Sequence, residues 1–352
     1  MPKTTPPPSV SLETLQTVLA ATADFAAFAP WEFAYDTDIV GLIDPVTGEV
    51  RIGCVLGNAG EVFGIVIYRR AGIRWILSML EGGSEDFEGL DAMEGMDCLK
   101  IEFVPKRELA KEDLAVLKVA AFKPSGKGAV WPQFRSVEPG WHPWYISQAE
   151  AEQLIADLPR LTAFYKMLEE HPGLFDDRAP TEVPFLPLAM PQRALSPQDI
   201  DWRPVLLSPE AALEPFQPAG GVLDELRALK RLPGCVCEFD CAILPGGSFI
   251  ENGRPCFGRC CMLVETRRGL VVGVSMLSGA LPVGEAAGRG LIECLRTANV
   301  LPEEIVIGGS RFQSALQPLC DALQIRLTPA SSLPALDEAV ASLSQHMSGR
   351  GV

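Results

Sequence analysis

Prolines crowd residues 172–218, and this segment constrains the fold more than any other feature of the sequence. Ten of the chain's 30 prolines lie there. Because proline fixes φ and lacks a backbone N–H, neither a long helix nor a central strand is expected within the segment. We predict a mostly extended connection over residues 172–218, with a strand near residues 202–207. It would join an N-terminal domain over residues 10–171 to a C-terminal domain over residues 219–347.

The composition predicts an acidic, cytoplasmic protein. Residues 1–9 are rich in proline and are expected to form a flexible tail, without the apolar run of a signal peptide. No stretch reaches the roughly 18–20 apolar residues of a membrane-spanning helix. The 45 acidic and 30 basic residues give a net charge of −15, which disfavours nucleic acid as a partner because phosphate binding needs surplus Lys and Arg. A protein or a small ligand is the expected partner, with no membrane association.

Apolar spacing predicts an α+β N-terminal domain. Three short apolar segments joined by tight turns, the first turn being residues 44–48 (DPVTG), indicate an antiparallel meander. Ser11 and Ser147 are predicted helix N-caps, the latter with Glu150 at capping-box spacing. The predicted strands are residues 39–43, 50–56, 62–68 and 99–104, and the predicted helices are residues 12–23, 73–80, 108–121 and 147–168.

The C-terminal half is predicted to have the order β-β-β-α-β-α-β-α. Over residues 232–345 this order resembles the ribonuclease-H-like fold, which implies a three-stranded antiparallel meander extended by two parallel strands, with helices on both faces. The fold class of the chain is therefore α/β. The predicted strands are residues 235–244, 256–266, 270–277, 304–307 and 325–328, and the helices are residues 222–229, 284–298, 310–323 and a last one beginning at Ser331 or Ser332.

The whole chain also resembles a bacterial two-domain family of unknown function. The resemblance rests on the turn at residues 44–48, on residues 139–144 (PGWHPW) and on residues 333–339 (LPALDEA). It implies an architecture of two domains and supplies no activity.

Carboxylates in the C-terminal half suggest a metal site. Active ribonuclease-H-like enzymes hold two divalent ions between carboxylates, one of them on the first strand. Glu238 and Asp240 share a face of that strand because side chains alternate, but residues 308–310 (GGS) offer no acid after the fourth strand. The candidate catalytic residues are Glu238, Asp240, Glu285, Asp337 and Glu338. Because one acid is missing, we expect no cofactor; Mg²⁺ or Mn²⁺ belongs to the alternative of a metal-dependent nuclease or phosphoryl-transfer enzyme.

Six cysteines in the same half raise the question of zinc. Same-face residues along a strand are roughly 6.6–7 Å apart, too far for a compact zinc knuckle. We therefore expect packing thiols and no metal ligands. The six are Cys235, Cys237, Cys241, Cys256, Cys260 and Cys261. Small residues over 284–290 (GEAAGRG) are likewise expected to allow close helix–sheet packing, since they match no phosphate-binding loop.

An aromatic segment in the N-terminal half has two interpretations. It could line a groove for a peptide or ligand, or it could be a rigid clasp that packs onto the N-terminal sheet. The candidate binding residues are Trp131, Trp141, His142, Trp144 and Tyr145. The leading hypothesis for the whole chain is a non-catalytic binding or interaction module, with the metal-dependent enzyme as the alternative.

Overall fold

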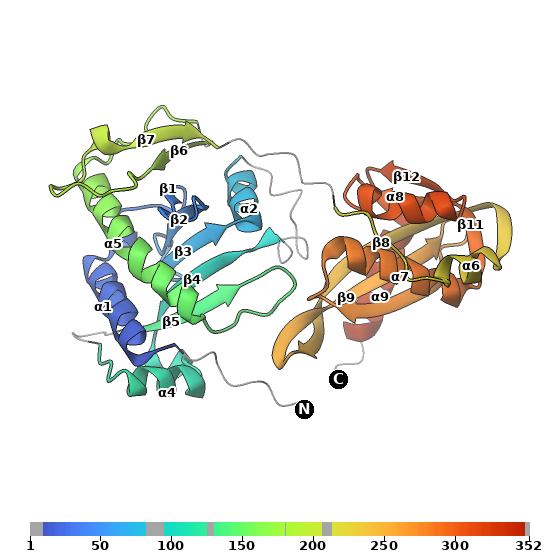
Figure 1. The fold of residues 1–352 in the computed structure, drawn as a ribbon, viewed down its shortest axis with the longest axis horizontal. Coiled ribbons are helices and arrows are strands. Elements are labelled where there is room, and N and C mark those ends of the chain that lie inside the picture. Colours follow the sequence, from blue (N-terminus) through green and yellow to red (C-terminus); the bar gives the residue numbers. More distant parts are fainter. Residues whose placement is uncertain (1–9, 82–94, 125–129, 180, 206–212, 349–352) are drawn as a thin grey trace. The chain divides into compact units, whose positions relative to one another are not determined.

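The computed structural model describes residues 10–81, 95–124, 130–179, 181–205 and 213–348. The chain divides into two compact units, one ending at Leu207 and the other beginning at Ser208 (Figure 1). None of the helices formed by these described residues is long and apolar enough to cross a membrane.

The N-terminal unit contains a seven-stranded sheet in the order β5-β4-β3-β2-β1-β6-β7 (Figure 1). The predicted meander is confirmed, since β1 to β5 pair antiparallel with their neighbours. Asp44 closes its first turn by accepting hydrogen bonds from the N–H groups of Val46 and Thr47, and Gly48 takes a positive φ of 75° there. The strands are β1 (Val40–Ile43), β2 (Val50–Leu56), β3 (Gly64–Arg69), β4 (Cys98–Val104), β5 (Trp131–Val137), β6 (Glu182–Phe185) and β7 (Asp201–Pro204).

Helices cover both faces of this sheet. The helices are α1 (Leu12–Phe28), α2 (Ala71–Leu80), α4 (Lys111–Val119) and α5 (Gln148–Glu170), with short 3₁₀ turns at Pro30–Glu32, Lys106–Glu108 and Pro197–Asp199. The N-caps predicted at Ser11 and Ser147 are confirmed, and Glu150 completes the capping box of α5. In β2, Val55 faces the core under α1 and α5, whereas Ile52 faces the core under α2. Alternate residues of each strand therefore meet different helices.

The proline-rich segment differs from its prediction as a connection. Strands β6 and β7 lie within residues 172–218 and extend the N-terminal sheet, with β6 parallel to β1 and antiparallel to β7. Proline is tolerated here because both strands are short, β7 is the edge strand, and β6 pairs with β1 only at Phe185. At the other end of the segment, the N–H of Phe216 donates to the carbonyl of Ala315 in the C-terminal unit. The N-terminal unit thus extends well beyond residue 171.

The C-terminal sheet has the order β10-β9-β8-β11-β12. Strands β8, β9 and β10 are antiparallel neighbours, and β11 and β12 add parallel to β8. This arrangement agrees with the order of elements predicted from the sequence, β-β-β-α-β-α-β-α. The strands are β8 (Lys230–Glu251), β9 (Arg254–Glu265), β10 (Leu270–Ser278), β11 (Val300–Gly308) and β12 (Arg326–Ala330). Strand β8 is longer than predicted because it pairs with β11 from Lys230 and with β9 as far as Glu251.

Helices flank this sheet on both faces, as predicted. The helices are α6 (Val222–Arg227), α7 (Val283–Ala298), α8 (Gln313–Ala322) and α9 (Pro334–Ser348). The first three pack on the face that carries Phe239, whereas Leu336 of α9 packs on the opposite face with Met262. The prediction that Ser310 caps α8 is wrong: the N-cap is Phe312, because Ser310 lies in the turn that precedes it.

Candidate functional site

Glu238, the first candidate metal ligand, is used as a helix cap. It is buried on β8, and its Oε2 accepts a 2.7 Å hydrogen bond from the N–H of Leu336 in the first turn of α9. A carboxylate at a helix N-terminus satisfies an orphan N–H and opposes the positive end of the helix dipole. The structure therefore gives this carboxylate a role in docking α9 onto the sheet.

The other candidate carboxylates do not join Glu238 in one cluster. Asp240 lies opposite Met262 on the α9 face of the sheet. Glu285 is on α7, which covers the other face, and pairs with Arg289 of the same helix. Asp337 and Glu338 are exposed on α9. Within the described ranges, no group of three or more His, Cys, Asp or Glu side chains has an arrangement that could hold a metal ion.

Removal of the Glu238 carboxylate should destabilise the C-terminal unit. We expect Glu238→Ala to lower the free energy of unfolding by about 1–3 kcal/mol, because the Leu336 N–H is left buried without its acceptor. Glu238→Gln should cost less, since an amide oxygen still accepts. Urea denaturation measures both. A rise in stability with Glu238→Gln would instead indicate that the carboxylate repels neighbouring acids, as in an empty metal site.

The cysteines lie mainly in the cores. All ten are reduced thiols, and nine of them are buried. Cys241 and Cys261 face each other across β8 and β9 with their Sγ atoms 3.1 Å apart, and Cys294 of α7 packs in the same core. Burial raises the pKa of the Cys294 and Cys320 thiols to about 12. Since the thiolate is the reactive form, such thiols are chemically inert in the folded protein.

A thiol titration should therefore separate one cysteine from the rest. Cys235 alone among the ten is partly exposed. We expect Ellman's reagent at pH 8 to modify one thiol quickly in the folded protein and all ten after denaturation. Cys235→Ser should abolish the fast phase. Fast modification of a second thiol in the native protein would contradict the buried packing of these residues.

The aromatic segment folds back on the edge of the N-terminal sheet. Trp131 begins β5, and Trp144 forms an antiparallel bridge with Ser136 of the same strand through hydrogen bonds of 2.8 and 2.9 Å. Tyr145 then packs edge-on against Trp144 and lies under the guanidinium of Arg135, 4.9 Å from its ring centre.

All five candidate binding residues of this segment are partly buried. Partial burial also lowers the pKa of His142. The segment therefore packs along the edge strand β5, and its role in binding stays a prediction.

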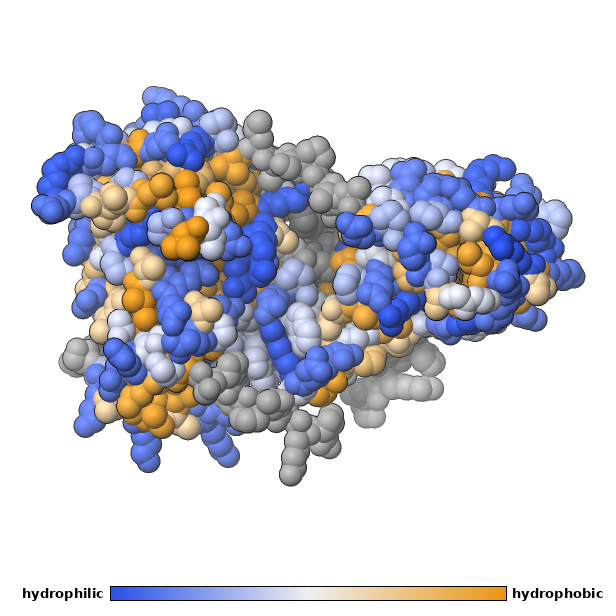
Figure 2. All heavy atoms as spheres, in the orientation of Figure 1, coloured by the Kyte–Doolittle hydropathy of each residue, from blue (hydrophilic) through white to orange (hydrophobic). Residues whose placement is uncertain are grey.

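Tyr145 also lines an apolar pocket of about 380 Å³. It is the one member of the five that does so. Helix α4 contributes Val116 and Val119, and Figure 2 shows hydrophobic residues gathered at the surface over this helix. The Asp113 carboxylate at this pocket is already engaged, because it receives two hydrogen bonds from Arg135.

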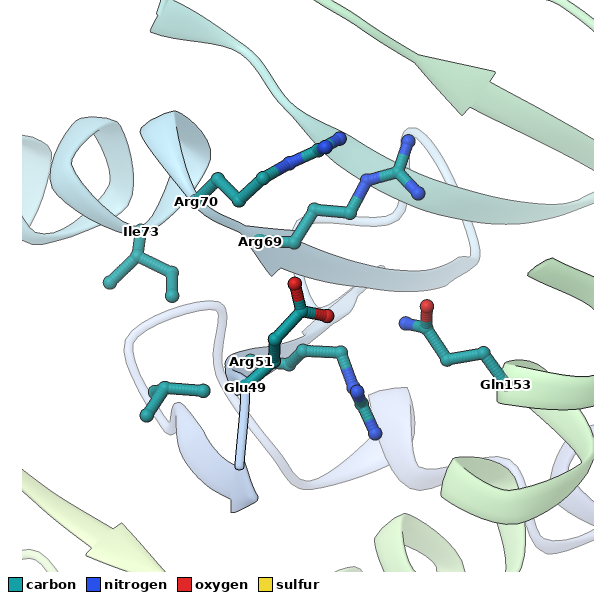
Figure 3. Close-up of a pocket in the computed structure, with 7 residues that line it drawn as sticks. Glu49, Arg51, Arg69, Arg70, Ile73 and Gln153 are labelled. Atoms are coloured by element: carbon teal, nitrogen blue, oxygen red, sulfur yellow. The ribbon is translucent and has the colours of Figure 1, made fainter. Parts of the chain in front are cut away.

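A second pocket, of about 330 Å³, is lined by arginines (Figure 3). Arg51 of β2 and Arg69 of β3 are direct cross-strand partners, and both lie on the face that α5 covers. Arg70 follows β3 immediately. The lining residues are Glu49, Val50, Arg51, Arg69, Arg70, Ile73 and Gln153.

Carboxylates hold these guanidiniums in place. Arg51, only 3% exposed, makes a bidentate pair with Asp157 of α5 at 2.9 and 3.0 Å and a third bond to Asp44 at 3.1 Å. Asp44 also accepts hydrogen bonds from the N–H groups of Thr47 and Val46, which with Arg51 lower its pKa to about 2. Arg51 is thereby fixed in one orientation on the sheet.

Arg69 is fixed in the same way. It contacts Asp97 at 2.7 Å, Glu150 at 2.8 Å and the Ser136 hydroxyl at 3.0 Å. Burial favours neutral Glu150, but its bonds from Ser136 and Ser147 and the Arg69 charge outweigh this and lower its pKa. The carboxylate is therefore ionised at neutral pH and orients the guanidinium.

One donor at the pocket makes no hydrogen bond of good geometry. Among the described residues this is the buried Nε2 of Gln153, although the Gln153 side chain lies close enough to Asp157 to favour the ionised form of that carboxylate. Figure 3 shows the Gln153 amide pointing toward the pocket. Arg51 and Arg69 each use three hydrogen bonds, which leaves further guanidinium N–H groups for a ligand.

Arg70, which lines the pocket, has a strained backbone and stands at the start of helix α2. Its φ of 46° lies in a region that non-glycine residues rarely adopt. It is also the N-cap of α2, so the positive end of that helix borders the pocket near Ile73. A strained residue that persists at a pocket is a marker of function.

Sequence reasoning missed this pocket. The alternation of side chains along β3 could have revealed it. Ile65 and Ile67 face the core, and Arg69 follows them at the same two-residue spacing. An arginine at an inward position requires a buried partner. Asp157 and Glu150, the partners that α5 supplies, are more than 80 residues away in the chain from Arg51 and Arg69, and nothing in the spacing of the sequence links them.

Comparison with known families agrees with the division of the chain into two units. Residues 16–184 match a family model described as a domain of unknown function, DUF7309, and residues 223–344 match another, DUF6930. The chain is thus built from two domains of unknown function, as the resemblance to a two-domain family predicted. No curated protein matches the chain.

Proposed function

We propose that the protein is a non-catalytic binding module whose N-terminal domain binds a small anion, a carboxylate or a phosphate, in the arginine pocket. The observation that carries this proposal is the pair Arg51 and Arg69, opposite each other on neighbouring strands, with side chains 3% and 13% exposed. Like charges placed directly opposite across a sheet repel each other, and here two carboxylates beside each guanidinium offset that repulsion. The carboxylates also fix the orientation of both guanidiniums, which suits recognition of a ligand.

The hydrogen bonding of the pocket supports an oxygen-rich ligand. A buried donor without an acceptor costs about 1–3 kcal/mol, and the Nε2 of Gln153 is such a donor at this pocket. Carboxylate and phosphate oxygens accept from several guanidinium donors at once. The end of α2 adds N–H groups that suit the same charge.

The lining residues favour binding over catalysis. Among the described residues that line the pocket there is no serine, cysteine or histidine, the common nucleophiles and acid–base groups, and Glu49 is the one carboxylate. The volume of about 330 Å³ falls in the range of small-molecule sites. We therefore assign the pocket to recognition of a small metabolite-sized molecule.

The test is a thermal-shift and calorimetric titration of the full chain with inorganic phosphate, glutarate and L-glutamate. We expect at least one of the three to bind at millimolar concentration or tighter and to raise the melting temperature by mass action. Arg70→Gly should abolish binding. Because glycine accepts a positive φ, this variant should lose little stability.

Arg107→Gln is the matched control. Arg107 is 84% exposed and does not line the pocket, so its loss removes the same charge without changing the site. Binding that survives in Arg70→Gly, or that is lost equally in Arg107→Gln, would refute the assignment to this pocket. Failure of all three compounds to bind would refute the proposed function.

A further inference from the structure

Glu49 places a negative charge inside the arginine pocket. It immediately precedes β2, is exposed, and lines the pocket together with the three guanidiniums. Figure 3 shows its carboxylate between Arg51 and Arg69. A pocket built only for anions would not be expected to hold a carboxylate, because it repels the ligand.

The three arginines of the pocket are ion-paired, whereas the Glu49 carboxylate beside them is not. Arg51 and Arg69 each contact two carboxylates, and Arg70 pairs with Asp97. Within the described parts of the chain, the Glu49 carboxylate has no ion pair and no hydrogen bond, although three arginines line the same pocket. Space therefore remains between its oxygens and the guanidiniums.

We infer that the ligand is a small zwitterion of the amino-acid class, with its carboxylate on the guanidiniums and its ammonium group on Glu49. The inference rests on the proposed function. A zwitterion meets both requirements at once: its carboxylate oxygens accept from Arg51, Arg69 and Gln153, and its ammonium donates to a carboxylate that otherwise lacks a partner. A simple anion satisfies the donors but is repelled by Glu49.

The experiment compares ligands that differ only in the ammonium group. Calorimetric titrations of the full chain with L-glutamate and glutarate, and with L-alanine and propionate, isolate its contribution. In the wild-type protein we expect the amino acid of at least one pair to bind up to about fivefold tighter than its partner, which corresponds to one exposed charge interaction.

Glu49→Gln supplies the decisive variant. It should weaken binding of the amino acid and strengthen binding of the matched simple anion, so that the preference disappears. Glu61→Gln is the control, because Glu61 is an exposed residue that does not line the pocket, and it should leave the preference intact.

The outcomes separate the two proposals. Equal or tighter binding of glutarate and propionate in the wild type would overturn the zwitterion inference and leave the anion pocket standing. A preference that persists in Glu49→Gln would overturn the role of Glu49. Absence of binding by phosphate, glutarate and L-glutamate would overturn the proposed function itself.

Discussion

Replacing Asp157 with alanine should lower the free energy of unfolding by about 3–5 kcal/mol. Asp157 is fully buried on α5 and makes a bidentate pair with Arg51, which is 3% exposed. Its removal leaves a buried guanidinium with one weaker partner, Asp44. An uncompensated buried charge destabilises the folded state by more than an intact buried ion pair stabilises it. Urea denaturation followed by circular dichroism measures the loss.

The double variant Arg51→Met, Asp157→Leu is the matched control. It removes both charges and keeps apolar volume, so we expect it to be close to the wild type in stability. Ligand binding should nevertheless be lost in the double variant, because the pocket loses one guanidinium. An Asp157→Ala protein as stable as the wild type would mean that Arg51 finds another acceptor, and would contradict the geometry described above.

Gly290→Ala should destabilise the C-terminal unit by about 1–3 kcal/mol. In an exposed helix the same change would stabilise by about 0.5–1 kcal/mol, because alanine is the better helix former. On α7, however, a Cβ at Gly290 would lie 2.1 Å from the Sγ of Cys261 and 2.5 Å from its Cβ. Cys261 is itself fully buried on β9, so neither residue has room to move.

Gly220→Ala provides the comparison. A Cβ at Gly220 meets no atom within 4 Å, so this variant should unfold with nearly the wild-type free energy. Thermal unfolding of both variants monitors the difference. A stabilising effect of Gly290→Ala would show that α7 can shift away from β9, and would contradict the prediction that small residues on this helix allow close packing.

The sequence by itself determined the architecture of each unit. Alternation of apolar residues located the meander, Ser147 and Glu150 marked the start of α5, and the order of elements after residue 219 predicted the C-terminal sheet. These features follow from local chemistry: side-chain period, caps and turns act within a few residues of one another. The small residues on α7 belong to the same group, since Gly288 and Gly290 both lie against neighbouring side chains.

Only the tertiary structure decided which polar residues work together. Glu238 shares its strand with Asp240, which suggested a metal site, but the packing of α9 brings the N–H of Leu336 to it instead. The proline-rich segment was predicted to be a connection because proline lacks the N–H that a strand donates. A missing N–H matters only where a neighbouring strand needs it, however, and β7 forms the edge of its sheet.

The arginine pocket depends entirely on long-range placement. Arg51 and Arg69 are opposite because β2 and β3 pair in one register, and Asp157 and Glu150 reach them because α5 crosses that face of the sheet. Charge interactions act through space and leave no periodic trace in the chain. Local patterns therefore specified the strands and helices, whereas the site came into existence only when strand register and helix packing brought distant charges together.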